Sequence, residues 1–218
     1  MKRVAIITSS DTGYRGERED LSGPAIREIV EKNGYEVVSE DVLPDDRKML
    51  SERMAEIADS GTAELILTTG GVSVGVKDLL PEVIEKLGAD LLFHGIDLKP
   101  GMPTMASLYN GKTIISLSGN PFSASAIFEL LMQPLIRKMT GSSHPVMVRK
   151  EAVLAHDYPG NIGSRRVLKA YDDGHAVHIT KGQHNAQMRQ GIGTNCLVDM
   201  PSGTGPLKAG DKVHIWRL

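Results

Sequence analysis

Three stretches rich in glycine and hydroxyl side chains have the composition of anion-binding loops. They read SSDTGYRGEREDLSG over residues 9–23, TTGGVSVGVKD over 68–78 and SLSGNPFSAS over 116–125. Each follows a short apolar run and precedes a segment with helical spacing. In a parallel sheet such loops share the carboxyl-terminal edge, where helix N–H groups and dipoles attract anions. Convergence of all three therefore favours a binding site over three separate structural turns.

The middle loop carries the strongest signal, because a plain turn does not need three glycines. Gly70, Gly71 and Gly75 would let the backbone approach a phosphate or a similar oxyanion closely and form a nest of N–H groups. A β-branched side chain would fill that approach path. Gly71→Val is therefore predicted to leave the fold intact and to weaken ligand binding.

Carboxylates accompany the loops and suggest a bound cation. Asp11 and Asp20 lie in the first loop, Asp45 and Asp46 follow the second predicted strand, and Asp78 ends the glycine loop. Magnesium is held by one or two carboxylates together with ligand phosphates, so Asp78 with Asp45 or Asp46 could form a Mg²⁺ site. In the alternative interpretation these aspartates cap a helix or lie in its first turn.

A lysine loop and several serines have less specific contexts. KPGMP over 99–103 could present Lys99 to an oxyanion, or could be a rigid loop with a solvated lysine. Ser73, Ser118 and Ser123 lack the context of a catalytic triad, which argues against a covalent hydrolase. Neither a Walker A motif nor a dinucleotide fingerprint occurs in the sequence.

The histidines do not predict a zinc site. His175 and His178 are three residues apart on a predicted strand, so they face opposite sides and form a poor chelating pair.

Composition narrows the class of protein. The chain has 218 residues, a formal net charge of -2 and only 4% aromatic residues. A nucleic-acid-binding protein normally needs more basic side chains and aromatic rings that stack on bases, so this composition argues against one. The lone Cys196 allows no internal disulfide and favours a reducing compartment. The first apolar run is too short for a signal peptide, and no later segment has the length of a membrane span. We expect a cytoplasmic protein.

Apolar runs and helical spacing alternate through the first two thirds of the chain. Strands are predicted over residues 4–8, 36–43, 65–69, 91–96 and 113–117. Helices are predicted over 22–34, 48–58, 78–88 and 122–141, with Ser22 as a cap and Pro134 as a possible kink. The alternation predicts an α/β domain over 1–143, three-layered and doubly wound with a mostly parallel sheet.

The pattern changes after Gly141. Turn signals such as PGNIG, DDG and KAGD separate short alternating runs, which predicts a small β-barrel or sandwich domain over 147–218. Arg165 and Arg166 lie in this basic region and could neutralise an anionic ligand.

The motifs resemble proteins of molybdenum cofactor biosynthesis. SSDTGYRGEREDLSGP resembles the opening of molybdopterin adenylyltransferases of the MogA and MoaB group and of the first domain of gephyrin. TTGGVSVGVKD, LKPGMP and LSGNPFSAS are more similar to motifs of MoeA-like molybdopterin molybdenumtransferases, which insert molybdate. The tail, with PSGTGPLKAGDKVHI, is similar to the carboxyl-terminal β-barrel domain of those enzymes. The combination of the three loop motifs makes the resemblance specific.

The resemblance implies a domain that binds the phosphate of the pterin dithiolene together with magnesium and an adenylate, either ATP or AMP. By motif position, Asp45 and Asp78 take the catalytic and metal-binding roles, with Asp46 as a further metal candidate. Lys99 and Ser123 fall where molybdenumtransferases contact molybdate and pterin. The implied ligand-binding residues are Ser10, Asp11, Asp20, Ser22, Gly23, Thr69, Gly70, Gly71, Ser73, Gly75, Lys99, Pro100, Gly101, Ser118, Gly119, Asn120, Pro121 and Ser123.

The chain departs from the molybdenumtransferase pattern at several positions. Met102 replaces the second lysine of KPGKP, Ser118 replaces a proline before GNP, and GQHN stands in place of a GQGS-like segment. The two amino-terminal domains of the molybdenumtransferases have no counterpart in the sequence.

Two classes of function remain. The chain is expected to be a magnesium-dependent transferase, either an adenylyltransferase or a molybdenumtransferase, or else a non-catalytic carrier or regulator that binds the pterin. In either case we expect a homo-oligomer, a dimer or trimer, with small-molecule ligands and no nucleic-acid or membrane partner.

Overall fold

The computed structural model describes residues 3–72, 79–139, 141, 147–180 and 193–218. The chain forms two compact units: Met1–Ile96 with Gly101–Ser125, and Asp97–Pro100 with Ala126–Leu218. The short Lys99 segment thus groups with the second unit, although its neighbours in the sequence belong to the first.

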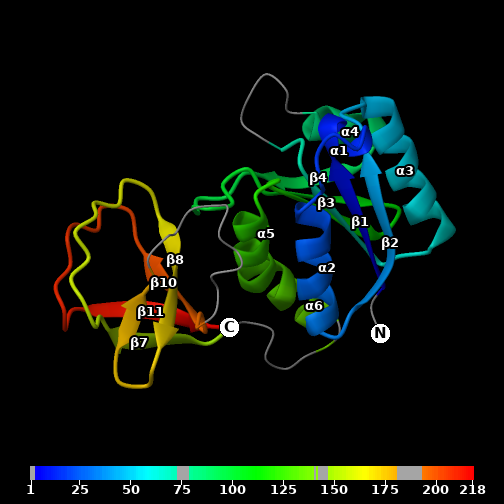
Figure 1. The fold of residues 1–218 in the computed structure, drawn as a ribbon. Helices are drawn as coiled ribbons and strands as arrows, with labels where there is room; N and C mark the ends of the chain where they lie inside the picture. Colours follow the sequence, from blue (N-terminus) through cyan, green and yellow to red (C-terminus); the bar gives the residue numbers. More distant parts are fainter. Residues whose placement is uncertain (1–2, 73–78, 140, 142–146, 181–192) are drawn as a thin grey trace. The chain divides into compact units, whose positions relative to one another are not determined.

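The first unit is built on a mixed six-stranded sheet in the order β2-β1-β3-β6-β5-β4 (Figure 1). The strands are β1 (Arg3–Ser9), β2 (Glu36–Leu43), β3 (Leu65–Thr69), β4 (Asp90–His94), β5 (Met105–Tyr109) and β6 (Lys112–Leu117). β2, β1, β3 and β6 pair in parallel, whereas β5 pairs antiparallel with both β6 and β4, so β5 alone is reversed among the six strands. The predicted mostly parallel sheet is therefore confirmed, with an antiparallel hairpin partner, β5, that the sequence analysis did not predict.

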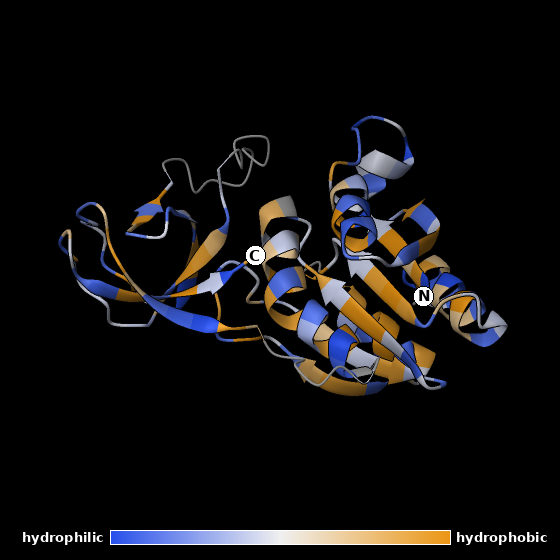
Figure 2. Cartoon of the chain, turned by 90° about the horizontal axis from the view of Figure 1, so that it is seen from below, coloured by the Kyte–Doolittle hydropathy of each residue, from blue (hydrophilic) through white to orange (hydrophobic). Residues whose placement is uncertain are grey.

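Helices cover both faces of this sheet. They are α1 (Asp11–Tyr14), α2 (Ser22–Lys32), α3 (Arg47–Ser60) and α4 (Leu80–Leu87). Ala5 and Ile7 of β1 pack in one apolar cluster with residues of α3 and α4. Val4 and Ile6 alternate to the opposite face of β1, on which α2 packs. Figure 2 shows the hydrophobic (orange) segments of the strands between these helices.

The helix after β6 is interrupted. α5 (Pro121–Ile127) continues into a π-helical turn, η1 (Phe128–Met132), and then into α6 (Gln133–Met139). The π turn directly precedes Gln133 and Pro134, and Pro134 has no N–H with which to continue the regular hydrogen-bond pattern.

The second unit contains a five-stranded antiparallel sheet in the order β7-β11-β10-β8-β9. Its strands are β7 (Arg149–Val153), β8 (Arg166–Asp172), β9 (Val177–Ile179), β10 (Cys196–Met200) and β11 (Lys212–Arg217). The sheet curls, because Leu154, just after β7, bridges Val177 of β9 and the Ala155 N–H donates to the Val177 carbonyl at 2.9 Å. This bridge is the only pairing between those edges in the described residues, so the predicted closed barrel is not confirmed.

Candidate functional site

The three glycine-rich loops of the first unit meet at one edge of its sheet. The Thr69 hydroxyl donates to the Ser118 carbonyl at 3.2 Å, joining the second loop to the third. Gly70 lies against the first loop. A Cβ atom added at Gly70 would stand only 2.3 Å from the Ser9 carbonyl oxygen. A Cβ on Gly119 would in turn stand 3.4 Å from the Gly70 Cα. The close approach of the three loops therefore requires glycine at this junction.

A serine ties the first loop to the third. Ser22 was predicted to cap α2, but α2 has Leu21 at its N-cap and no side-chain capping bond. The Ser22 hydroxyl instead donates to the Gly119 carbonyl at 2.8 Å. The Ser22 hydroxyl thus donates to a distant carbonyl, whereas the capping rule has the serine oxygen accept from a local backbone N–H.

Two consecutive glycines have left-handed backbone, with φ of +83° at Gly70 and +66° at Gly71. A Cβ at Gly71 would stand 3.4 Å from the Ser9 Oγ, 3.5 Å from the Leu80 Cγ and 3.6 Å from the Ser9 Cβ, which are ordinary contact distances. The space alone would accept a small side chain, but a β-branched residue is strained at positive φ. Gly71→Val is therefore expected to strain the backbone as well as to fill the approach path, so weaker ligand binding by this variant would not by itself identify the site.

Asp45 is joined to the first loop by two hydrogen bonds. Its Oδ1 accepts from the Ser9 hydroxyl at 2.6 Å, and its backbone N–H donates to the Asp11 Oδ1 at 2.9 Å. Ser9 was not among the predicted site residues. The only feature of the sequence that could have indicated its role is its place at the end of a buried strand. The exposed carboxylates of Asp11 and Asp45 therefore lie next to the glycine junction.

The other aspartates have local partners. Asp46 caps α3 by accepting from the Met49 N–H at 2.8 Å, the alternative role considered for it. Asp20 accepts from the Thr8 hydroxyl at 2.7 Å and from the Ser22 N–H at 2.9 Å. A Cβ on Gly23 would stand only 2.6 Å from the Asp20 Oδ2, so Asp20 and Gly23 pack against each other at the start of α2.

The chemistry of Asp45 fits a magnesium ligand, because hard cations prefer carboxylate oxygens. Within the residues that the structure describes, no group of three or more His, Cys, Asp or Glu side chains could hold a metal. Asp78, the proposed second ligand, lies outside the described residues, as do Ser73 and Gly75.

The third loop presents a buried hydroxyl. The Asn120 Oδ1 accepts from the N–H groups of Phe122 and Ser123, at 3.0 and 3.4 Å, so this side chain satisfies the first free donors of α5, which begins at Pro121. The Asn120 N–H lies 3.4 Å from the Ser118 Oγ. Ser123 is only 1% exposed, and its hydroxyl has no hydrogen-bond partner among the described residues. A buried hydroxyl without a partner indicates a place for a ligand atom or a water.

Ser10 has a structural role beside the loop junction. Its hydroxyl caps α1 by accepting from the Gly13 N–H at 3.1 Å.

The Lys99 segment is held by the second unit. The Lys99 N–H donates to the Arg165 carbonyl at 2.9 Å, and its carbonyl accepts from the Val167 N–H at 2.8 Å. The Lys99–Pro100 peptide bond is cis, and Gly101 follows with φ of +117°. The backbone of this segment therefore pairs with the start of β8.

One of the two arginines expected to meet an anion has an internal partner. Arg165 donates from Nε and Nη2 to the Asp199 carboxylate, both at 2.9 Å. Asp199 is 2% exposed and also binds Arg149, and both guanidinium groups lie about 6 Å from the centre of the Trp216 ring. The hydrogen bonds to Asp199 raise the pKa of Arg165. Arg166 differs, since its buried Nε has no partner in the described part of the chain.

The fold and the loop junction together define an α/β domain in which three glycine-rich loops meet at one edge of the sheet. The family model described as a probable molybdopterin binding domain matches residues 5–138. The chain therefore belongs to the family of molybdopterin-binding domains of molybdenum cofactor biosynthesis.

Curated relatives match beyond this domain. A molybdopterin molybdenumtransferase of Staphylococcus aureus is 30% identical over 96% of this chain and 51% of its own length. The enzyme of the same name from Bacillus subtilis is 32% identical over 70% of this chain and 36% of its own. The chain spans about half the length, or less, of these relatives.

Solved structures give the same two likenesses that the motifs suggested. A molybdopterin biosynthesis MoeA protein from Pyrococcus horikoshii has a TM-score of 0.77 and 25% identity, covering 99% of this chain and 54% of that one. The molybdopterin biosynthesis enzyme MoaB from Thermus thermophilus has a TM-score of 0.54 and 29% identity, covering 65% of this chain and 98% of that one. No helix in the described residues is long and apolar enough to cross a membrane.

Proposed function

We propose that this chain is a transferase of molybdenum cofactor biosynthesis that acts on adenylated molybdopterin and inserts molybdate. The main support is the junction at which Ser9, Gly70 and Gly119 bring three loops of a molybdopterin-binding domain together. Insertion is preferred to adenylyl transfer because relatives named molybdopterin molybdenumtransferase match both units, over 96% of this chain.

The proposed site uses backbone for the ligand phosphate and side chains for its orientation. The positive-φ backbone at Gly70 and Gly71 lets a phosphate approach without a Cβ in the way. The unpartnered Ser123 hydroxyl would donate to an oxygen of the ligand. Thr69, Ser118 and Ser22 hold the loops together, so the cradle is formed before the ligand binds.

Asp45 is the proposed magnesium ligand, with Asp78 as the second. A bound Mg²⁺ would neutralise phosphate charge during cleavage of the adenylate. The Ser9 hydroxyl fixes the orientation of one Asp45 oxygen. Asp46 is assigned to capping α3 and not to the metal, because its Oδ1 accepts the Met49 N–H.

The experiment is a single-turnover assay of the purified full chain. Protein is incubated with adenylated molybdopterin, Mg²⁺ and molybdate, and the pterin product and released AMP are identified by mass spectrometry. Insertase activity predicts molybdate-dependent AMP release. A parallel incubation with molybdopterin and ATP tests adenylyl transfer by pyrophosphate release. If the pterin binds but neither reaction occurs, the chain is a non-catalytic carrier and both proposed enzyme activities are ruled out.

We also propose that the chain works as a homo-oligomer. The edge strand β4 exposes Leu91 and Leu92, which are 51% and 55% exposed, and edge strands with apolar side chains are sites of association. Light scattering should give a mass of two or three chains, and Leu92→Lys should lower it. A monomer in the wild type would contradict this proposal. The lone buried Cys196 fits a reducing compartment such as the cytoplasm.

A further inference from the structure

Two histidines face each other where the curled sheet of the second unit brings its edges together. The His178 Nδ1 lies 3.3 Å from the His156 Nε2, and the ring centres are 5.2 Å apart in an edge-on arrangement. His156 directly follows Ala155, and His178 directly follows Val177. Ala155 and Val177 are the residues whose backbones are bonded across the two edges.

A carboxylate sets the proton position on one of these rings. The His178 Nε2 lies 2.9 Å from the Asp173 Oδ2, and Asp173 also accepts from the N–H groups of His175 and Ala176, both at 2.8 Å. A neutral His178 therefore carries its proton on Nε2 and directs the lone pair of Nδ1 toward His156.

The separation of the two nitrogens matches a shared metal ion. Two imidazole nitrogens at about 2.0–2.1 Å from a tetrahedral zinc ion stand about 3.4 Å apart. A metal-bound histidine commonly donates its other N–H to a carboxylate, which is the arrangement of His178 and Asp173. In the bound form His156 would carry its proton on Nδ1, so that the lone pair of its Nε2 also faces the ion.

We propose that His156 Nε2 and His178 Nδ1 bind one divalent transition-metal ion of the zinc, nickel or copper class. The protein supplies two ligands, in keeping with the absence of any three-residue metal group among the described residues, and water completes the coordination. His156 is exposed and the His178 side chain is 38% exposed, so the ion can enter from solvent.

The bound ion would link the two edges of the sheet. His156 follows β7 and His178 lies in β9, the first and last strands in the order of the sheet. An ion bound to both adds a link to the single backbone bridge between these edges. Because binding to the folded state alone stabilises it by mass action, the ion should raise the melting temperature of this unit.

Calorimetric titration of the untagged, chelator-treated full chain with Zn²⁺ tests the proposal. The expected result is one ion per chain, with binding weakened at least about tenfold in His156→Gln and in His178→Gln, as expected for loss of one of two ligands. His175→Gln is the matched control, because it removes a neighbouring exposed imidazole that lies outside the pair.

Thermal unfolding gives an independent readout. Zn²⁺ should raise the melting temperature of the wild type and of His175→Gln, and leave that of His156→Gln unchanged. Lack of Zn²⁺ binding by the wild type, or wild-type binding and stabilisation in His156→Gln, would overturn the proposal. Circular dichroism of each variant without metal shows whether it has folded, and His178→Gln provides the second test if His156→Gln has not.

Discussion

The Ser9 hydroxyl donates a 2.6 Å hydrogen bond to the Asp45 carboxylate and thereby joins the loops that follow two adjacent parallel strands. The bond positions one carboxylate oxygen and leaves Asp45 exposed beside the glycine junction. It also makes Asp45 distinguishable by experiment from its neighbour Asp46, which has the same charge and caps a helix.

Asp45→Asn should lower the rate of molybdate-dependent AMP release by about two orders of magnitude, because a phosphoryl site loses a metal ligand. Asp46→Asn should keep most of the rate, since asparagine caps helices about as well as aspartate. Both rates are measured under single-turnover conditions at saturating Mg²⁺. The reverse ranking of the two variants would assign the metal to Asp46.

Gly70→Ala should destabilise the protein far more than Gly61→Ala. Both glycines have positive φ, but a Cβ at Gly70 would stand 2.3 Å from the Ser9 carbonyl oxygen, whereas nothing lies within 4 Å at Gly61. The left-handed backbone alone costs about 1–2 kcal/mol, which is the expected loss at Gly61. Urea unfolding measures both free energies, and equal losses would show that the loops do not meet at Gly70.

Ser123→Ala should weaken pterin binding about tenfold while changing the free energy of unfolding little, because the wild-type hydroxyl has no partner to lose. Ser107→Ala is the matched control, since Ser107 of β5 is equally buried and also lacks a partner in the described residues. Ligand titration by fluorescence gives the affinities. Equal pterin affinity in Ser123→Ala and the wild type would remove Ser123 from the site.

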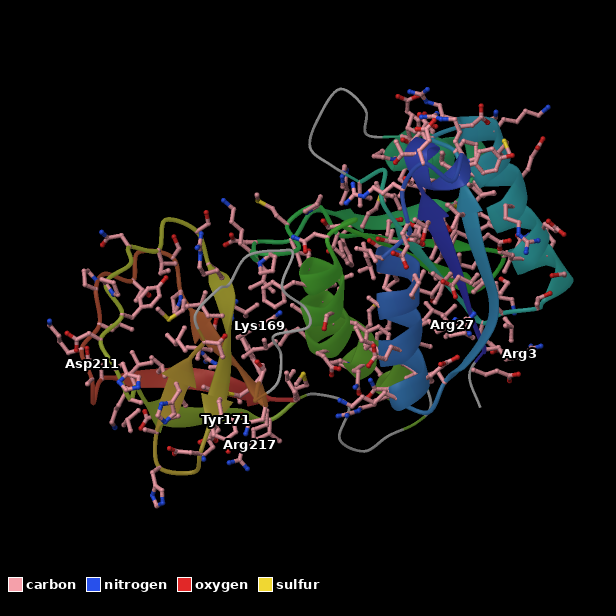
Figure 3. All side chains as sticks on the ribbon, in the orientation of Figure 1. Arg3, Arg27, Lys169, Tyr171, Asp211 and Arg217 are labelled. Carbon is pink, nitrogen blue, oxygen red and sulfur yellow. The ribbon has the colours of Figure 1, made fainter. Side chains whose placement is uncertain are left out.

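The second unit should lose stability on acidification through Asp172. This buried carboxylate binds Arg217 (labelled in Figure 3) at 2.9 Å and Lys150 at 3.6 Å. The Arg217 hydrogen bond, then the Gly174 N–H and the charges of Lys150 and Arg217, lower the pKa of Asp172 from its ordinary value of 3.8. Since the folded-state pKa is the lower one, this stabilisation is present above about pH 4 and is lost as the pH falls toward the folded-state value.

The pH experiment uses Trp216, the only tryptophan, as the probe of the second unit. Urea unfolding of the wild type and of Arg217→Gln is followed by fluorescence from pH 7 to pH 3. The stability difference between them should be largest above pH 4 and shrink below it. A difference that stays constant over this range would show that Arg217 acts without Asp172.

Cys196 should resist alkylation in the native protein. Burial raises the pKa of its thiol to about 11, and the side chain is fully buried in β10. Only the thiolate reacts, so iodoacetamide at pH 8 should leave the folded chain unmodified and label it in urea. Mass spectrometry measures the label, and rapid native modification would mean that the second unit opens readily.

Local sequence signals predicted the regular elements well. The bounds of β2 and β3 agree with the predicted ranges 36–43 and 65–69. β3 is a buried, β-branched run that ends at Gly70, whereas β2 mixes apolar and acidic residues and lies between turn residues at Asn33–Gly34 and Pro44–Asp45. β5 was missed although Asn110 and Gly111, both at positive φ, form the turn that joins it to β6. Asn-Gly between two short runs is a strong hairpin signal, so β5 could have been predicted from the sequence.

The hydrogen-bond and ion-pair partners of polar side chains were harder to predict from the sequence. Ser22 meets a carbonyl 97 residues away, and His156 meets His178 only because the sheet curls. Arg165 was expected to be available to an anion, and instead pairs with Asp199. Each of these contacts depends on tertiary structure that residue spacing along the chain does not encode. The convergence of the three loops was predictable because it follows from the rule for parallel sheets.

The assignment of Asp97–Pro100 to the second unit has a consequence for how the chain can be divided. The chain passes between the units three times, after Ile96, after Pro100 and after Ser125. Two domains joined by a single linker can be exchanged by one recombination event. Here an exchange at the single point after Ser125 would separate Asp97–Pro100 from the Arg165 carbonyl and the Val167 N–H with which Lys99 pairs, so a chimera with a relative would have to exchange the Lys99 segment along with the carboxyl-terminal sheet.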